Sequence, residues 1–89
     1  MVRKNVRARA DWPPTVMSGH LTWAADEERK GHLLVSGPIA DGSGGIYLIR
    51  AETSDEAEKI ARDDPAIQSG CCSYALHEWD IRRGRELFA

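Results

Sequence analysis

The order of periodic patterns along the chain is the feature that most limits how it can fold. Apolar residues that recur every second position predict a strand, and a period of about 3.6 predicts a helix. On this basis we expect a strand over 2–9, a helix over 18–30, strands over 32–36 and 46–50, a helix over 53–63 and a last strand over 72–81.

This order of elements is typical of a ferredoxin-like α+β fold, written βαββαβ. We expect a four-stranded antiparallel sheet with two helices on one face, formed by residues 1–89 as a single domain. No further helix is expected to cover the other face. A second copy of the chain would cover it, which predicts a homodimer in the form of a dimeric α+β barrel.

Capping and turn residues set the expected ends of these elements. Ser18 is expected to cap the first helix and Gly31 to end it, which places His20 in the first turn. Thr53 and Glu56 form a capping-box sequence for the second helix. In the first strand Arg3, Arg7 and Arg9 share one face, which we expect to be exposed to solvent.

Composition removes several classes of function. With 14 acidic against 12 basic residues, the net charge of -2 argues against a nucleic-acid binder. No apolar run reaches the length of a membrane span, and no apolar core follows the basic N-terminus, so neither a membrane nor a secreted protein is expected. The adjacent Cys71 and Cys72 are expected to be reduced packing residues of a cytoplasmic protein. No cofactor motif is present, and His20, His32 and His77 are not expected to converge on a metal.

The predicted topology brings chemically useful residues to one rim of the sheet. These are His20, the pair Asp63 and Asp64, the loop residues Asp11 and Trp12, the segment Ser36, Gly37 and Pro38, and the two cysteines. A histidine beside a carboxylate can act as a general acid or base. Trp12 could stack on a flat ligand. The alternative is structural, with His20 packing at a helix start and Asp64 ending a helix.

The chain resembles the YciI-like family. The resemblance rests on His20-Leu21 in the first helix, Gly31, the run Leu33 to Pro38, Thr53 to Ala57, and Asp63-Asp64-Pro65, in that order and spacing, and it covers residues 18–81. It implies a ferredoxin-like subunit that pairs into a dimeric barrel. It also implies a His–Asp catalytic dyad, which here falls on His20 and Asp64, with Asp63 as the other candidate.

The resemblance also suggests an activity without a cofactor. It implies proton abstraction and elimination on a small phenolic or quinone-like compound, such as loss of HCl from a chlorinated hydroxyhydroquinone. Arg7 or Arg9 would then stabilise a phenolate or the departing chloride. The alternative hypotheses are a lactone isomerase similar to muconolactone isomerases, a cofactor-free monooxygenase and a non-catalytic module that binds a small molecule. The first strand is more basic than is usual in this family, which suggests an anionic substrate.

Overall fold

The structure is a computed structural model that describes residues 1–88 as one sheet with helices. Its strands are β1 (Val2–Asn5), β2 (Leu33–Pro38), β3 (Gly44–Ile49) and β4 (Cys72–Ala75). Its α-helices are α1 (Pro14–Arg29), α2 (Ser54–Arg62) and the short α3 (Pro65–Gln68). Two 3-10 turns, η1 (Arg9–Asp11) and η2 (Arg85–Phe88), complete the elements. None of these helices is long and apolar enough to cross a membrane.

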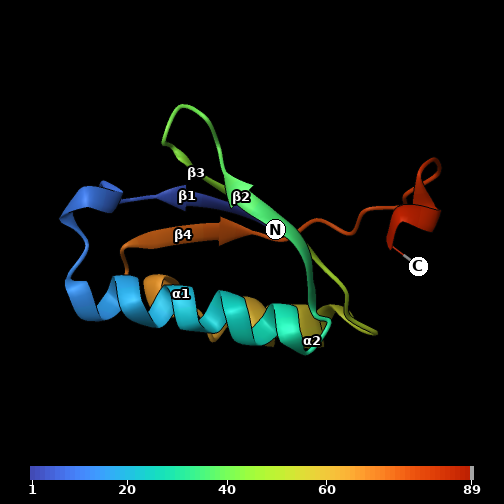
Figure 1. Cartoon of the computed structure of the whole chain (residues 1–89), viewed down its shortest axis with the longest axis horizontal. Coiled ribbons are helices and arrows are strands. Elements are labelled where there is room, and N and C mark those ends of the chain that lie inside the picture. The colour runs from blue at the N-terminus through green and yellow to red at the C-terminus, as the bar shows by residue number, and fades with distance from the viewer. Residues whose placement is uncertain (89) are drawn as a thin grey trace.

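The four strands form one antiparallel sheet in the order β2-β3-β1-β4. Helices α1 and α2 lie on the same side of this sheet, and the chain beyond β4 runs out away from the body (Figure 1). The predicted ferredoxin-like α+β fold is therefore confirmed. Along β1, side chains alternate between the two faces, so Arg3 points toward the helices while Val2 and Lys4 point away.

Several predicted boundaries are wrong. Helix α1 begins at Pro14, four residues before the expected start, because a proline in the first turn gives up an N–H that would have no helical partner anyway. His20 therefore lies in the second turn. Strand β2 continues through Gly37 and Pro38, which an edge strand tolerates. Residues expected to be a connection form α3, and β1 and β4 are shorter than predicted.

Two apolar clusters hold the helices to the sheet. The first contains Trp12, Ala66, Cys71 and Cys72, with Val16 and Met17 packed against it. The second contains Trp23, Leu33, Tyr47 and Ile60. Both cysteines are free and buried, as predicted. The early start of α1 matters here, since it brings Val16 and Met17 against the first cluster.

Candidate active site

Asp64 is fixed by the start of helix α3. It is the N-cap residue, and its Oδ1 accepts a hydrogen bond of 2.9 Å from the backbone N–H of Ala66. Pro65 follows at the first helical position, where its ring suits the helical φ angle. Gly19 on α1 allows the close approach of this turn, because a Cβ there would lie 3.0 Å from Cγ of Pro65. The Gly19-His20 sequence therefore brings α1 against α3 where the carboxylate is held.

His20 and Asp64 form a buried pair. Nδ1 of His20 lies 3.0 Å from both carboxylate oxygens of Asp64, and the two residues are 4% and 0% exposed. Asp63 is exposed, so Asp64 is the carboxylate that faces the imidazole. The histidine ring lies between the two apolar clusters. It meets Trp12 edge-on at 5.5 Å and stacks on Trp23 at 5.9 Å between ring centroids.

The other ring nitrogen of His20 contacts Arg3. The prediction that Arg3 is exposed to solvent is wrong, because its side chain is buried. Arg3 is 2% exposed, and its Nη1 lies 3.1 Å from Nε2 of His20. The same Nη1 donates a 2.7 Å hydrogen bond to the hydroxyl oxygen of Tyr47 on β3. Strand β1 turns this side chain inward because Gly45, its partner in the β1–β3 register, leaves the space empty. A Cβ at Gly45 would lie 3.2 Å from Nη2 of Arg3.

The contacts fix the tautomer of the imidazole. A guanidinium only donates hydrogen bonds, so Nε2 of His20 must accept from Arg3. Nδ1 then carries the hydrogen and donates it to Asp64. The result is a continuous chain from Asp64 through His20 and Arg3 to Tyr47. Sequence reasoning missed Arg3 and Tyr47 as site residues. The available signal was the pair Gly44-Gly45 before the apolar run of β3, which leaves space for a large side chain from a neighbouring strand.

Burial changes the titration of two groups beside this chain. Desolvation raises the pKa of Tyr47 to about 12, against the opposing positive charges of Arg3 and Arg9. Desolvation likewise raises the pKa of the Cys72 thiol to about 11. At neutral pH the phenol of Tyr47 therefore keeps its hydrogen and can donate it, and Cys72 is a poor nucleophile.

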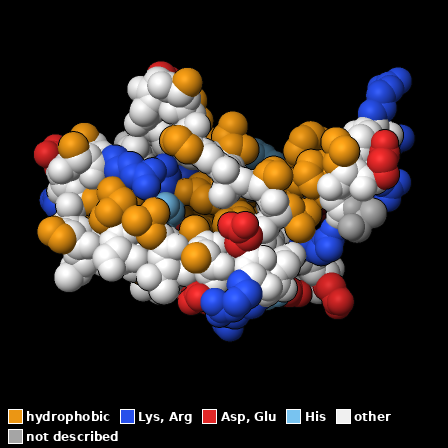
Figure 2. Space-filling model, in the orientation of Figure 1, with side chains coloured by type: hydrophobic (Ala, Val, Ile, Leu, Met, Phe, Trp, Pro, Cys, Tyr) orange, Lys and Arg blue, Asp and Glu red, His pale blue; other side chains and the backbone are white. Residues whose placement is uncertain are grey.

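The arginines of β1 and of the segment that follows it have different surroundings, some beside the dyad and some in solvent. Trp12 is buried, and the guanidinium carbons of Arg3 and Arg9 lie 5.4 Å and 5.6 Å from the centroid of its ring. Figure 2 shows Lys and Arg side chains gathered over β1 and the segment that follows it, next to hydrophobic side chains. Asp11 and Arg7 are exposed and line a separate cavity of about 430 Å³ next to Cys71. Of the predicted rim residues near η1, Trp12 lies against His20, and two arginines hold Trp12 in place. The guanidinium of Arg9 lies on its ring, and the backbone oxygen of Arg7 accepts a 2.9 Å hydrogen bond from its indole N–H.

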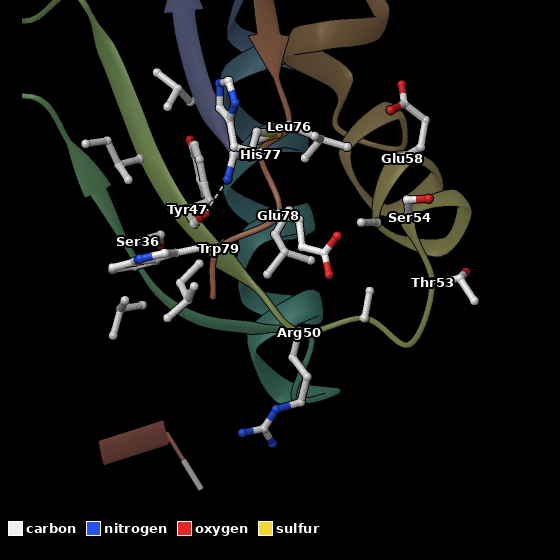
Figure 3. A pocket seen from close by; sticks show the side chains of 18 of the residues that line it. Ser36, Tyr47, Arg50, Thr53, Ser54, Glu58, Leu76, His77, Glu78 and Trp79 are labelled. Atoms are coloured by element: carbon white, nitrogen blue, oxygen red, sulfur yellow. Dashed lines mark hydrogen bonds between the residues drawn. The ribbon is translucent and has the colours of Figure 1, made fainter. Parts of the chain in front are cut away.

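Ser36, Gly37 and Pro38 lie elsewhere than at the dyad. They are exposed on β2 and line a groove of about 990 Å³ that extends from the open face of β2 and β3 to the first turns of α2. In Figure 3 the segment that carries Leu76, His77 and Trp79 passes between Tyr47 and Ser36 on one side and Ser54 and Glu58 on the other. Tyr47 lines this groove as well as contacting Arg3. It is the one residue that links the groove to the buried chain.

The remaining histidines do not join the site. His32 pairs with Glu27 at the far end of α1, with Nδ1 2.6 Å from the carboxylate oxygen. His77 is exposed in the groove. Within residues 1–88, no three side chains of the His, Cys, Asp and Glu types converge as metal ligands would.

Comparison with known proteins gives the family. A YCII-related domain matches residues 4–80 of this chain. An uncharacterized protein of Bacillus subtilis strain 168, YjpA, is 30% identical over 67 residues, which cover 75% of this chain and 79% of that protein. No solved structure matches the chain significantly. The family model spans most of the described residues, from β1 to beyond β4, and includes both His20 and Asp64. The chain therefore belongs to the family of proteins with a YCII-related domain.

Proposed function

We propose that this chain is a small enzyme that transfers protons with the His20–Asp64 pair. Its substrate would be a small cyclic compound of phenolic or quinone-like character. The observation that carries the proposal is the buried chain of Asp64, His20 and Arg3. An apolar core of the same volume is often as stable as a buried ionic network or more so. A network of this kind beside aromatic side chains is therefore a reasonable candidate for chemistry.

The dyad assigns a role to each nitrogen of His20. Asp64 accepts from Nδ1 and so keeps the unprotonated Nε2 as the proton acceptor. In the finer form of the proposal, the protein is a cytoplasmic lyase that removes HCl from a chlorinated hydroxyhydroquinone. His20 carries a proton from a ring hydroxyl to the carbon that bears chlorine. Chloride then leaves with the electron pair of its bond, and a second hydroxyl loses its proton to water. The sum is loss of HCl without an oxidant.

A non-catalytic binding module is the second candidate. It is favoured by the contact between Arg3 and Nε2, which occupies the proton acceptor in this structure. It is also favoured by the position of the groove of about 990 Å³, whose lining includes neither His20 nor Asp64. A module of this kind would bind its ligand on the open sheet face and leave it unchanged.

The proposal includes a homodimer formed through the open sheet face. Val2, Val35 and Ile46 are large apolar side chains exposed on that face. A sheet with one apolar face left open normally packs against another layer. A second copy of the same face would supply that layer with two-fold symmetry.

The test is turnover of chlorinated hydroquinones, unchlorinated quinols and enol-lactones, with and without oxygen. Chloride release, oxygen use and product mass are followed. The proposal expects chloride release that needs no oxygen and falls by about a hundredfold or more in His20→Gln, since general acid–base catalysis contributes about that much. Oxygen use with quinols would instead indicate a monooxygenase, and an isomerised lactone would indicate an isomerase.

His32→Gln is the matched control. His32 is also a histidine whose Nδ1 faces a carboxylate, but it lies at the other end of α1 and has no arginine on its second nitrogen. Turnover in this variant should stay within about twofold of the parent. Equal losses in the two variants would show that the decrease comes from weakened folding. Saturable ligand binding without turnover in the folded parent would favour the binding module.

A further inference from the structure

Two arginines converge on one side of His20 without a carboxylate of their own. Arg3 and Arg9 both lie against the ring of Trp12. Among the described residues, no carboxylate oxygen lies within 4 Å of a nitrogen of either guanidinium. The nearby negative charge is Asp64, which is engaged by His20 and by the backbone of Ala66. The site therefore carries an excess of positive charge.

Arg3 also has a hydrogen-bond donor that nothing satisfies. Its Nε is buried and has no partner among the described residues, although its Nη1 makes two contacts. Leaving a charged donor buried and unpaired is costly, by about 1–3 kcal/mol or more. Such a group in a native structure calls for a missing partner. For a guanidinium the natural partner is an oxygen anion, which can accept two of its N–H groups at once.

We propose that Arg3, together with Arg9 and Trp12, forms the subsite for a planar oxyanion of the substrate, a carboxylate or a phenolate. This inference rests on the proposed function, because it names the part of the substrate that enters beside the dyad. Arg3 is then the residue that selects a negatively charged ring compound. The indole of Trp12 provides the apolar wall against which that ring stacks.

Binding of the anion would also release the base. Nη1 of Arg3 now donates to Nε2 of His20. An anion on Arg3 is a stronger acceptor than a neutral imidazole nitrogen, since hydrogen bonds to charged partners are about twice as strong. It would therefore draw Nη1 away and leave Nε2 free to accept a proton. The contact between Arg3 and Nε2 of His20 thus keeps the dyad inactive in this structure, and an anionic ligand would release it.

Arg9 is the side chain that can move to admit the ligand. Arg3, His20 and Trp12 are buried, and neither cavity is lined by Arg3 or His20. Arg9 is only partly buried, and its guanidinium is held by the face of Trp12 and by one contact of 3.7 Å to the sulfur of Met17. A cation on an aromatic face contributes about 1 kcal/mol, so displacing it is inexpensive.

The experiment is a titration of the whole protein with benzoate, followed by NMR. The signals are the indole N–H of Trp12 and the ring nitrogens of His20, and benzamide serves as the neutral analogue of the same shape. Benzoate should shift both residues saturably, and benzamide should not. Arg3→Met should weaken benzoate binding at least about tenfold, and Arg9→Met by about threefold or more, as expected for losing a charged hydrogen bond or a weaker cationic contact.

Arg7→Met is the matched control, since Arg7 is an exposed arginine of the same segment. It should bind benzoate within about twofold of the parent. Equal weakening by Arg7→Met, equal binding of benzamide, or no shift with benzoate would each overturn the subsite. Arg9→Met keeps the test decisive if Arg3→Met fails to fold. Arg3-dependent benzoate binding without turnover of any quinol would leave the subsite standing and remove only the enzyme proposal.

Discussion

At the scale of single residues, Tyr47 gives the sharpest dependence on pH. Its folded-state pKa is raised to about 12 by burial, whereas an unfolded tyrosine ionises at about 10. The stabilising effect of this shift is fully present below pH 10. As the pH rises from about 10 to about 12, the unfolded chain loses this proton and the folded chain keeps it. The free energy of unfolding should therefore fall through that window.

Tyr47→Phe should flatten this alkaline decline. The slope of unfolding free energy against pH should become shallower by at most about 1.4 kcal/mol per pH unit, the limit for one proton. The variant should also lose about 1 kcal/mol at pH 7, because Arg3 loses a hydrogen-bond acceptor. Urea unfolding at a series of pH values measures both effects. Cys72, whose pKa is raised to about 11, contributes its own alkaline decline in the parent and in the variant. A slope that is unchanged in Tyr47→Phe would therefore mean that Tyr47 does not contribute to the decline.

The burial of Arg3 marks the limit of what alternation in a sequence can reveal. The period of two correctly separates Arg3 from Val2 and Lys4, but it does not say which face turns inward. We expected the arginine face to be exposed because charged side chains usually lie in solvent. The structure buries it because helix α1 supplies an imidazole and strand β3 supplies both a phenol and a glycine gap. Such partners are distant in sequence, and only the assembled sheet brings them together.

At the scale of elements, the β1–β3 pairing depends on Gly44. A Cβ built there would lie 1.8 Å from the backbone oxygen of Arg3, a distance that requires the strands to separate. Gly44→Ala should therefore destabilise the fold by about 2–3 kcal/mol. Gly37→Ala is the matched control on the neighbouring strand, because nothing lies within 4 Å of its added Cβ. That variant should change stability by less than about 1 kcal/mol, in the stabilising direction.

Thermal unfolding of the two glycine variants measures this difference. Similar stabilities would mean that β1 can shift to accept a methyl group, and the position of Arg3 would then not be held by the pairing.

The order of the elements was easier to predict than their ends. Hydrophobic period and turn residues specify the ferredoxin-like order. Pro14 suits the first position of α1, but a proline alone does not specify where a helix starts. The packing of Val16 and Met17 against the first apolar cluster, which favours this start, depends on residues distant in sequence.

At the scale of the whole molecule, the open face of the sheet predicts association. Ile46 is 57% exposed on that face, and Leu21 is 53% exposed on helix α1. The two side chains are thus comparably exposed and similar in size, but only Ile46 lies where a second copy is expected. Ile46→Lys should place a charge in the interface of each copy and weaken dimerisation by at least about a hundredfold, since an unpaired buried charge costs several kcal/mol. Leu21→Lys should leave the dimer intact.

Light scattering after size-exclusion chromatography, over a range of protein concentrations, distinguishes the two variants. A parent that is monomeric at every concentration would contradict the homodimer and leave the groove of about 990 Å³ open to another ligand. A dimer that survives Ile46→Lys but not Leu21→Lys would move the interface to the helix face. Tyr47 lines the groove and accepts a hydrogen bond from Arg3, which contacts His20, so Tyr47 and Arg3 would connect a partner in this groove to the dyad. If the open face is the interface, monomeric Ile46→Lys should therefore also alter the benzoate-induced shift of His20, whereas Leu21→Lys should reproduce the parent.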